Sequence, residues 1–428
     1  MEGKMFEYNN SPALEYIFGF SHSGKPVRDL SRTRRLLAAL GDPQERLRFV
    51  HIAGTNGKGS TARMFDGVFV HAGLKTGLFT SPFIIEYADR IQVNDENISV
   101  KALERLVEKV RTVVDKLPEK AEFSQFEITQ AIAFLYFVEM KCDIVVLETG
   151  LGGLLDCTNV IKRPLLTVIT KVDLDHTAIL GDTVELIAEQ KAGIIKQGCP
   201  CVLSAGNCTA VGQVVRKKAD KMGAELVIPD TDKLEVLHRG LHTTLFNYDG
   251  LAAHTSMAGE HQVMNALSVI EGCRLLADKL KLSDDDIAEG IAAAVLPGRT
   301  EILSTKPLVM LDGGHNPDGM RALAKVIRDK APVRAIIGMC GDKNLRAALG
   351  EIIPFVDSFV TVDGFSDRAE NAGELAELIN QLGGKARKAE GSLLEEYENM
   401  KRDNAYGLTL VCGSLYLVSA MKAALADK

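Results

Sequence analysis

Arg48-Phe-Val-His-Ile-Ala-Gly-Thr-Asn-Gly-Lys-Gly-Ser-Thr61 is an apolar run followed by a loop with three glycines, one lysine and two terminal hydroxyl side chains. The apolar, partly β-branched residues predict a strand, and the helix formers of residues 62–72 predict a helix. The glycines can accept positive φ and let successive backbone N–H groups approach a phosphate at a helix N-terminus. We therefore predict a strand, a phosphate-binding loop and a helix.

The side chains of this loop also suit a nucleotide. Lys58 supplies a positive charge for the β- and γ-phosphates, and the hydroxyl of Ser60 or Thr61 can reach a bound Mg²⁺. The spacing is not the standard one, because Ile52 stands where a glycine is usual and Gly59 where a hydroxyl is usual. The alternative is an ordinary glycine-rich turn that leads into a helix.

The run Gly54-Thr-Asn-Gly-Lys-Gly-Ser-Thr61 resembles the altered phosphate loop of the folylpolyglutamate synthase and dihydrofolate synthase family, which is related to the Mur ligases. The resemblance implies an α/β fold, in which a P-loop-type ATPase domain with a parallel sheet precedes a smaller Rossmann-like domain. Leu296-Pro-Gly-Arg299 interrupts a helical pattern, and strands and helices alternate again after it. We therefore predict an ATP-binding domain with a folate-binding loop at 1–297 and a parallel α/β ligase domain at 298–428.

Composition limits the class of protein. The 428 residues are enough for two domains, and 50 basic against 57 acidic residues give a net charge of -7, which argues against a general nucleic-acid or anionic-membrane binder. Met1–Asn10 lacks the apolar core of a signal peptide, and no apolar run reaches membrane-spanning length, so we predict a cytoplasmic protein. Eight cysteines are too sparse for a disulfide scaffold, and the group Cys199, Cys201 and Cys208 lacks a partner pair at zinc spacing.

The region before the phosphate loop has a basic run. Residues 11–20 and 28–40 have helical patterns on either side of a break at Gly24 and Pro26. The basic residues lie on the polar side of the second helix, and we predict that they form a solvated face; they are Arg28, Arg32, Arg34 and Arg35.

A long polar segment, residues 80–94, follows the next predicted strand. Long ordered loops in compact domains are often functional, although a plain surface excursion is the alternative. Its Ser-Pro step followed by Asp89-Arg90-Ile91 resembles the substrate loop of the family, and the family glycine-rich run matches Gly150–Asn159, with Leu154 where many members have arginine. The resemblance implies a folate or dihydropteroate site that contains Ser81, Pro82, Phe83, Arg90, Ser124, Phe126, Asp156 and Cys157.

Two residues, Glu148 and His176, suggest a metal site. Glu148 ends the apolar run that begins at Asp143, where ligands bind in parallel sheets, although a solvent-facing strand end is equally compatible with the sequence. Asp175-His176-Thr177 resembles the metal-site histidine motif of the family, whereas a lone histidine is more often structural. The resemblance implies two Mg²⁺ ions near Ser60, Glu148 and His176, and a carbamylated Lys191 as an anionic ligand; the alternative for Lys191 is a surface lysine on an amphipathic helix.

Further matches extend along the chain. Met257–Ala266 resembles the family segment near the adenine of ATP, with His261, Gln262 and Asn265, although Gln262 and Asn265 could simply face solvent. Asp312-Gly-Gly-His-Asn-Pro317 ends a predicted strand, and in Mur-type ligases this motif faces the phosphate site. The resemblance implies ATP contacts from Gly54, Thr55, Asn56, Gly57, Lys58, Gly59, Ser60, Thr61, Asn265, Arg299 and Asp312, and catalytic roles for Lys58, Lys191, Asp312 and His315.

These observations predict an ATP- and Mg²⁺-dependent ligase that joins L-glutamate to a folate through an acyl phosphate, and that can also act on dihydropteroate. We expect a monomer whose partners are small molecules, without nucleic acid or membrane. A Mur-type cell-wall ligase is the nearest alternative, but the region before the phosphate loop is short. Thr170-Lys-Val-Asp173 mimics the guanine-recognising tetrapeptide of GTPases, although no Asp-x-x-Gly switch follows a strand between residues 60 and 170, and a nucleotide-binding regulator without turnover is a third alternative.

Overall fold

The computed structural model describes residues 11–21, 29–402 and 406–426. The N-terminal segment Met1–Asn10, the Gly24 and Pro26 break and Arg28 lie outside these residues. The chain forms two compact units. Unit 1 contains Met1–Glu235, Asn247–Ala253 and Met264–Ala294, and unit 2 contains Val236–Phe246, His254–Val263 and Val295–Lys428. The domain boundary between 297 and 298 stays a prediction.

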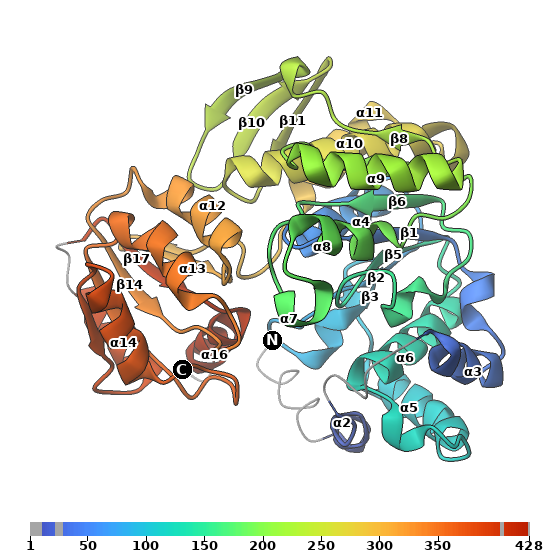
Figure 1. The fold of residues 1–428 in the computed structure, drawn as a ribbon, viewed down its shortest axis with the longest axis horizontal. Coiled ribbons are helices and arrows are strands. Elements are labelled where there is room, and N and C mark those ends of the chain that lie inside the picture. Colours follow the sequence, from blue (N-terminus) through green and yellow to red (C-terminus); the bar gives the residue numbers. More distant parts are fainter. Residues whose placement is uncertain (1–10, 22–28, 403–405, 427–428) are drawn as a thin grey trace. The chain divides into compact units, whose positions relative to one another are not determined.

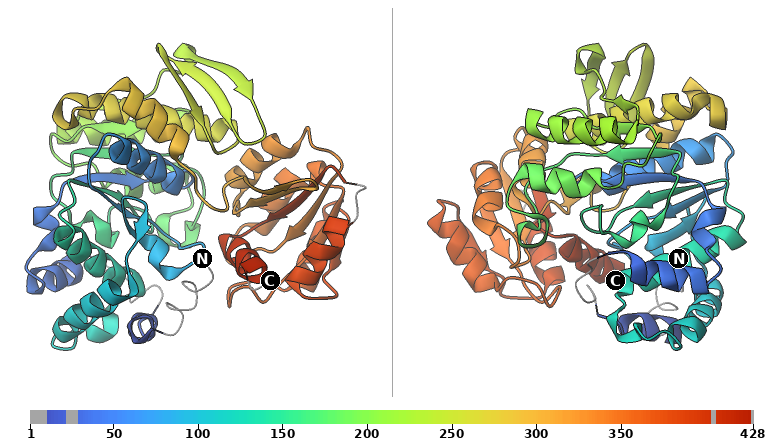
Figure 2. Two further views of the ribbon diagram at one scale, coloured as in Figure 1. Left: turned by 180° about the vertical axis from the view of Figure 1, so that it is seen from behind. Right: turned by 45° about the vertical axis from the view of Figure 1, so that its right-hand side comes forward.

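Unit 1 is built on one sheet in which β1 is central (Figures 1 and 2). Its strands follow the order β4-β3-β2-β5-β1-β6-β7-β8, and β3 and β4 are antiparallel to their neighbours while the others pair in parallel. Every residue of β1 is buried, as expected for a strand that has neighbours on both edges and helices on both faces. The bounds are β1 Phe49–Ala53, β2 Thr76–Phe79, β3 Ile91–Val93, β4 Glu96–Asn97, β5 Ile144–Glu148, β6 Leu166–Ile169, β7 Cys201–Leu203 and β8 Leu226–Val227.

Several helices of unit 1 begin where a polar side chain caps them. Ser99, Ser124, Thr183 and Ser283 each accept a hydrogen bond from a backbone N–H in the first turn of the helix that follows. Residues 260–263 of α10 cluster with unit 2 and the rest of the helix with unit 1. The bounds are α2 Pro12–Phe18, α3 Ser31–Ala39, α4 Lys58–His71, α5 Val100–Val114, α6 Gln125–Glu139, α7 Thr177–Leu180, α8 Val184–Ala192, α9 Thr209–Met222, α10 Glu260–Leu280 and α11 Asp284–Ala293.

The predicted solvated face of α3 is wrong for Arg32. This side chain is buried, and its Nε and Nη2 donate to the two carboxylate oxygens of Glu127 on α6 at 3.0 and 2.7 Å. Thr33 also donates to Glu127, at 2.8 Å. A buried charge requires such pairing. The helical spacing did not indicate this bidentate ion pair, which joins α3 to α6.

Unit 2 contains a six-stranded sheet in the order β12-β13-β17-β14-β15-β16. The predicted parallel arrangement holds for five strands, but it is wrong at one edge because β12 pairs with β13 in the antiparallel direction. Neither β12 nor β16 was predicted. The bounds are β12 Glu301–Thr305, β13 Leu308–Asp312, β14 Val333–Ile337, β15 Ser358–Thr361, β16 Ala386–Lys388, β17 Leu408–Cys412, α12 Pro317–Ile327, α13 Leu345–Ile352, α14 Ala372–Gln381, α15 Leu393–Arg402 and α16 Leu415–Ala426.

A separate sheet contains three strands that follow one another in the chain, in the order β11-β10-β9. Its strands are β9 Leu234–Arg239, β10 Thr244–Tyr248 and β11 Leu251–Thr255. The sequence of residues 234–248 is typical of a β-hairpin, which corresponds to β9 and β10, but it does not indicate β11.

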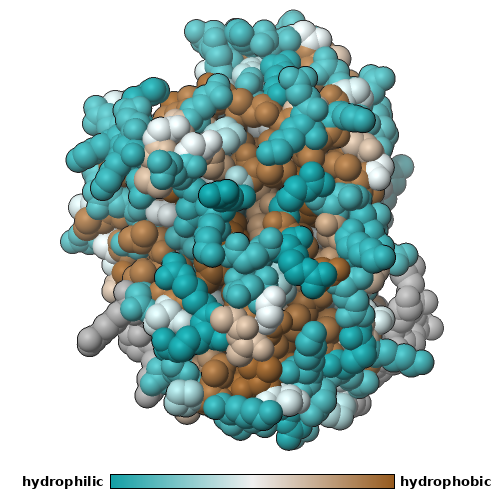
Figure 3. Space-filling model, turned by 90° about the vertical axis from the view of Figure 1, so that its right-hand side faces the viewer, coloured by the Kyte–Doolittle hydropathy of each residue, from teal (hydrophilic) through white to brown (hydrophobic). Residues whose placement is uncertain are grey.

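The surface alternates in polarity, and Figure 3 shows hydrophilic and apolar residues interspersed on one face. None of the helices in the described ranges is long and apolar enough to cross a membrane. The predicted fold class, a parallel-sheet α/β domain followed by a second α/β domain, is confirmed.

The contact between α4 and α11 gives a test of packing. A Cβ on Gly290 would overlap the Cα and backbone nitrogen of Val68, which cannot rotate away. We expect Gly290→Ala to destabilise unit 1 by about 1–3 kcal/mol, a typical effect of overpacking. The matched control is Gly212→Ala in α9, where nothing lies within 4 Å of the new methyl group and helix propensity favours alanine by about 0.5–1 kcal/mol. In urea unfolding followed by circular dichroism, we expect the midpoint to fall below that of the unmodified protein for Gly290→Ala only. Equal midpoints for both variants would contradict this packing.

Candidate functional site

The phosphate loop is shorter than predicted, because α4 already begins at Lys58. Gly57 is the N-cap with φ of 87°, and it supplies no side-chain hydrogen bond to the first turn of the helix. Gly57 is the one glycine of the loop with positive φ, and Gly54 and Gly59 do not use this freedom. The first N–H groups of a 14-residue helix therefore have no side-chain cap, which suits an anion.

Gly54 is required for a close approach rather than for its φ. A Cβ at this position would overlap the hydroxyl of Thr170, which donates to the Asn56 carbonyl at 2.7 Å. The backbone N–H of Thr55 donates to the Lys171 carbonyl at 2.7 Å. The segment after β6 therefore holds the phosphate loop against the end of β1.

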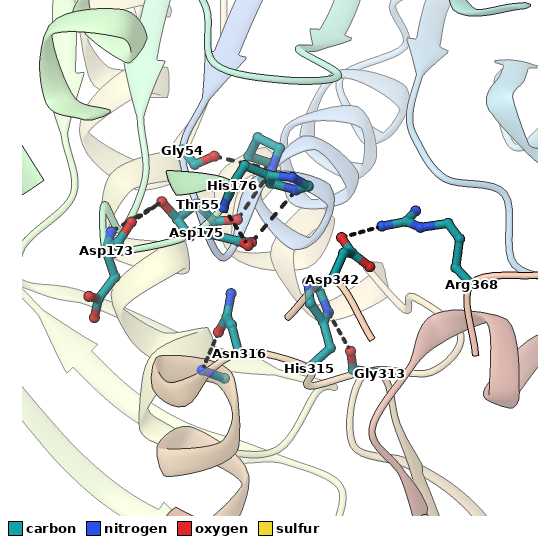
Figure 4. Close-up of polar contacts among 12 residues, drawn as sticks. Gly54, Thr55, Asp173, Asp175, His176, Gly313, His315, Asn316, Asp342 and Arg368 are labelled. Carbon is teal, nitrogen blue, oxygen red and sulfur yellow. Dashed lines mark hydrogen bonds and ion pairs between the residues drawn. The ribbon is translucent and has the colours of Figure 1, made fainter. Parts of the chain in front are cut away.

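Asp173 has a local role in this arrangement (Figure 4). Its backbone N–H and carbonyl both bond with the Thr55 hydroxyl, at 3.1 and 3.0 Å. Its side-chain carboxylate accepts from the N–H of Leu174 at 2.7 Å. The tetrapeptide Thr170–Asp173 thus supports the phosphate loop. These hydrogen bonds give its residues a structural role that requires no bound guanine.

Two lysines converge on the carbonyl oxygen of Gly54. Lys58 Nζ donates to it at 3.1 Å and to the Thr55 carbonyl at 3.2 Å, and Lys191 Nζ donates to the same Gly54 oxygen at 2.7 Å. Lys58 lies in the first turn of α4 and Lys191 in the last turn of α8. Two lysine side chains from different helices therefore meet at the phosphate loop.

Lys191 is only 3% exposed, so the surface-lysine alternative is wrong. Burial, and next the positive charge of Lys58, lower the pKa of Lys191 to about 7. A large fraction of this side chain is then a neutral amine near pH 7. A neutral amine is a nucleophile, which the ordinary lysine ammonium is not.

Glu148 lies beside the phosphate loop. It pairs with Ile52 in the register of β5 and β1, and it is 3% exposed, so the solvent-facing alternative is wrong. Its Oε2 accepts from the N–H of Ser81 at 3.2 Å, which ties the substrate loop to this strand end. Ser60 is buried in the first turn of α4. These oxygen donors follow neighbouring strands, as expected of a Mg²⁺ site.

His176 is the N-cap residue of α7 and has a left-handed φ of 50°. Its backbone N–H donates to Asp175 Oδ1 at 2.9 Å, and its ring Nε2 lies 3.9 Å from Asp175 Oδ2 (Figure 4). Among the described residues, no three His, Cys, Asp or Glu side chains form a cluster that could hold a metal by themselves. Mg²⁺ commonly takes one or two protein ligands together with phosphate oxygens and water, so Ser60 and Glu148 fit a nucleotide-bound ion.

The substrate loop is stabilised by Asp89 and contains a cation–aromatic stack. The Asp89 carboxylate accepts the backbone N–H groups of residues 84, 85 and 86, at 3.3, 2.7 and 3.1 Å. The guanidinium of Arg90 lies 5.3 Å from the ring centre of Phe83 and 5.7 Å from that of Tyr87. The predicted residues Phe83 and Arg90 are therefore in contact, next to the Ser81-Pro82 step.

The second group of predicted substrate residues surrounds the start of α6 and the glycine-rich loop. Phe126 lies 5.5 Å from Phe79, ring centre to ring centre, and a Cβ on Gly150 would be 2.7 Å from its ring. Ser124 forms a capping box with Glu127, so its hydroxyl is engaged within the helix start. Asp156 and Cys157 are buried; burial raises the pKa of both groups.

Unit 2 places polar residues at the carboxyl edge of its own sheet. Asp312, which ends β13, accepts from the N–H of Thr300 at 2.9 Å and of Gly314 at 2.7 Å. His315 Nδ1 bonds with the Gly313 carbonyl at 3.0 Å (Figure 4). A Cβ on Gly313 would lie 3.2 Å from an Arg299 Nη1 atom, so Arg299 is beside the same turn.

The sequence analysis missed Arg368 in this region. It follows β15 and forms an ion pair with Asp342, which follows β14, at 2.6 Å (Figure 4). The signal available in the sequence was an arginine that shortly follows an apolar, strand-like run. Parallel strands bring both loops to the edge that also carries Asp312 and His315.

Two polar residues in the first turns of α10 do not face solvent. Gln262 and Asn265 are both buried, and a Cβ on Gly57 would overlap the amide oxygen of Asn265. The alternative in which both residues face solvent is therefore wrong. Asn265 lies against the N-cap of α4, where a nucleotide would bind.

Comparison with known proteins decides the family. Residues 52–272 match the Mur ligase middle domain, and residues 298–414 match the Mur ligase glutamate ligase domain. A folylpolyglutamate synthase of Lacticaseibacillus casei is 33% identical over 97% of this chain and 98% of its own length. The chain belongs to the folylpolyglutamate synthase and dihydrofolate synthase family of Mur ligases.

Two further relatives of this family are informative. A dihydrofolate synthase/folylpolyglutamate synthase of Bacillus subtilis is 35% identical over 92% of this chain and 94% of its own length. A solved folylpolyglutamate synthase complex with AMPPCP and folate is 30% identical, covers 96% of this chain and 98% of its own, and superposes with a TM-score of 0.82. The predicted family is confirmed.

The buried Lys191 makes a prediction about pH. Between its folded pKa of about 7 and the ordinary value of 10.5, the unfolded chain binds a proton that the folded chain does not. Stability should therefore rise with pH across this window, by up to about 1.4 kcal/mol per pH unit from this group. Lys191→Met should remove that part of the slope, measured by denaturant unfolding between pH 7 and 10 in carbon dioxide-free buffer. Identical slopes for the two proteins would show that Lys191 keeps an ordinary pKa.

Proposed function

We propose that this protein uses ATP to join the amino group of L-glutamate to the γ-carboxylate of a folate. The observation that carries the proposal is the convergence of Lys58 and Lys191 on the Gly54 carbonyl, beside the uncapped N-terminus of α4. Family membership makes the enzyme class an ATP-dependent ligase. A relative with the same fold binds an ATP analogue and folate, which supports both substrates.

The chemistry needs activation, because a carboxylate and an amine do not condense in water. A carboxylate oxygen of folate attacks the γ-phosphorus of ATP, and ADP leaves with the electrons of the broken P–O bond. The neutral amine of glutamate then attacks the acyl carbon, and inorganic phosphate leaves with the original carboxylate oxygen. One proton of the amine is lost in this second step.

The residues of unit 1 suit the first step. Negative charge accumulates where the folate carboxylate meets the triphosphate, and the first N–H groups of α4 together with Lys58 offset it. Bound Mg²⁺ supplies further charge neutralisation, and Ser60, Glu148 and His176 are the residues that would hold it. Asn265 and the remaining loop residues would contact the nucleotide.

Lys191 suits a carbamate. Its neutral amine can add to carbon dioxide with loss of one proton, which gives an anion with two oxygen donors. The resulting anion would lie within reach of the Gly54 carbonyl region, where Lys58 provides a positive neighbour. Carbamylation of Lys191, a second Mg²⁺ ion and the roles of Asp312, Arg299 and His315 toward phosphate and amine are parts of this proposal.

The folate side of the proposal uses the aromatic and polar residues of unit 1. Phe83, Arg90 and Phe126 offer flat surfaces for a pterin, and Ser81 and Asp156 lie on the two loops tied to Glu148 and Gly150. The Mur-type cell-wall alternative is less supported, since the relatives that cover nearly the whole chain are named for folates. A cytoplasmic location and a monomeric state stay predictions.

Turnover with alternative substrates tests the function. We expect ATP-, Mg²⁺- and glutamate-dependent phosphate release with tetrahydrofolate, and a product heavier by one glutamyl residue in mass spectrometry. Turnover with dihydropteroate as well would make the enzyme bifunctional. Lys58→Met should lower kcat/KM by about 100-fold or more, because removal of a transition-state charge contact commonly has that effect. Folded, ATP-binding protein without activity toward either folate would contradict the proposal.

Carbamylation can be observed without turnover. Protein equilibrated with ¹³C-bicarbonate near pH 8 should show a carbamate carbon resonance, because the Lys191 amine is largely neutral there. Lys191→Met should lack that resonance, and Lys196→Met is a matched control since the pKa of Lys196 is also lowered, to about 8, by burial. A resonance that persists in Lys191→Met, or none in the unmodified protein, would contradict this part of the proposal.

A further inference from the structure

His51 is a fully buried histidine in the middle of the central strand, and no step of the proposed reaction uses it. It pairs in register with Leu147 of β5 and Thr167 of β6. Its Nε2 lies 2.9 Å from the hydroxyl oxygen of Thr158, and its Nδ1 has no hydrogen-bond partner among the described residues. Burial lowers the pKa of His51 to about 3, so the ring is neutral at physiological pH.

The direction of the hydrogen bonds follows from proton counting. The Thr158 hydroxyl has one proton and donates it to Asp156 Oδ1 at 2.6 Å. The Thr158 oxygen is then an acceptor, so His51 donates from Nε2–H and its Nδ1 carries the lone pair. A buried acceptor without a partner is unfavourable by about 1–3 kcal/mol, so this tautomer persists because the bond to Thr158 selects it.

The hydrogen bonds end on the glycine-rich loop. Asp156 Oδ1 also accepts from the N–H of Thr158 at 3.0 Å, and Oδ2 accepts from the N–H of Leu151 at 2.8 Å. The preceding residue, Gly150, packs so closely on Phe126 that a side chain there would overlap the ring. The Asp156 carboxylate thereby fixes the loop between Glu148 and Thr158 against the aromatic residue of the folate side.

We propose that His51 is a positioning residue for the folate subsite, acting through Thr158 and Asp156 on the glycine-rich loop. The inference rests on the proposed function, because it takes Phe126 and Asp156 as part of the folate site. The neutral Nε2–H of His51 orients the Thr158 hydroxyl, and this hydroxyl orients the Asp156 carboxylate. The carboxylate then fixes the position of the glycine-rich loop relative to Phe126. The phosphate loop has hydrogen bonds of its own with Thr170 and Lys171, so we expect binding of ATP to change less than binding of the folate when the bonds from His51 are lost.

Conservative variants separate positioning from general packing. Gln at position 51 places an amide N–H where Nε2–H lies, whereas Asn reaches only the position of Nδ1. Ser at position 158 keeps the hydroxyl, whereas Val replaces it by a methyl group of similar size. Thr167→Val is the matched control, since Thr167 is buried on the neighbouring strand β6 and its hydroxyl bonds to the Pro200 carbonyl.

The experiment measures KM for tetrahydrofolate and for ATP in the full-length variants, with thermal midpoints alongside. We expect His51→Asn and Thr158→Val to raise KM for the folate at least about tenfold and to leave KM for ATP within about twofold. His51→Gln, Thr158→Ser and Thr167→Val should keep both values within about threefold of those of the unmodified enzyme.

Each of the following results would overturn the inference. Unchanged folate KM in Thr158→Val would show that the bonds only stabilise the fold, and an equal rise in KM for ATP would show a general disturbance. The same rise in KM for the folate in Thr167→Val would show that the effect is not specific to the bonds from His51 through Thr158 to Asp156. An unmodified enzyme without turnover of either folate would contradict the proposed function and this inference together, whereas normal turnover with unaffected variants would contradict the inference alone.

Discussion

The close approach of the phosphate loop to the segment after β6 is the constraint on which the site depends. Thr170 occupies the space that a side chain at position 54 would need, and the Lys171 carbonyl accepts the N–H of Thr55. This contact exposes the Gly54 carbonyl to two lysines from separate helices. A larger residue at position 54 would displace the loop, and with it the geometry that lowers the pKa of Lys191.

The two lysines illustrate how one contact changes the chemistry of another. A lysine ammonium that donates to a carbonyl is ordinary, but one that is also buried and close to a second cation is easier to deprotonate. The protein thus places a side chain with a pKa near neutrality next to the position expected for the γ-phosphate. Glu148, on the strand beside β1, adds an anionic neighbour on the other side of the loop. Opposite charges are therefore arranged around one helix N-terminus, where triphosphate charge is to be stabilised.

Much of the fold could be predicted from residue patterns. Apolar runs that end in glycine-rich or acidic segments marked β1, β5 and β13, because buried parallel strands are apolar throughout and ligand-binding residues follow their carboxyl ends. The edge strands β12 and β16 were missed, since partly exposed strands are short and mixed in polarity. The antiparallel pairing of β12 depends on the neighbouring strand rather than on any local pattern.

The site was predictable in type but not in detail. Family motifs named Lys191, Glu148 and Asn265, yet helical spacing alone suggested an exposed lysine, and burial is a property of the folded chain. Arg32 was assigned to a solvated face because its partner Glu127 lies 95 residues away. The Arg368–Asp342 pair and the bond between His51 and Thr158 also join distant segments, so no short sequence window contains them.

The central claim is that the folate carboxylate is activated as an acyl phosphate, and isotope transfer tests it most directly. Folate labelled with ¹⁸O in its γ-carboxylate should pass one labelled oxygen to inorganic phosphate in each turnover, because phosphate leaves with that oxygen when glutamate attacks. Mass analysis of the released phosphate measures the transfer. Phosphate with one ¹⁸O per product amide is the predicted result, and unlabelled phosphate alongside normal product formation would contradict the account.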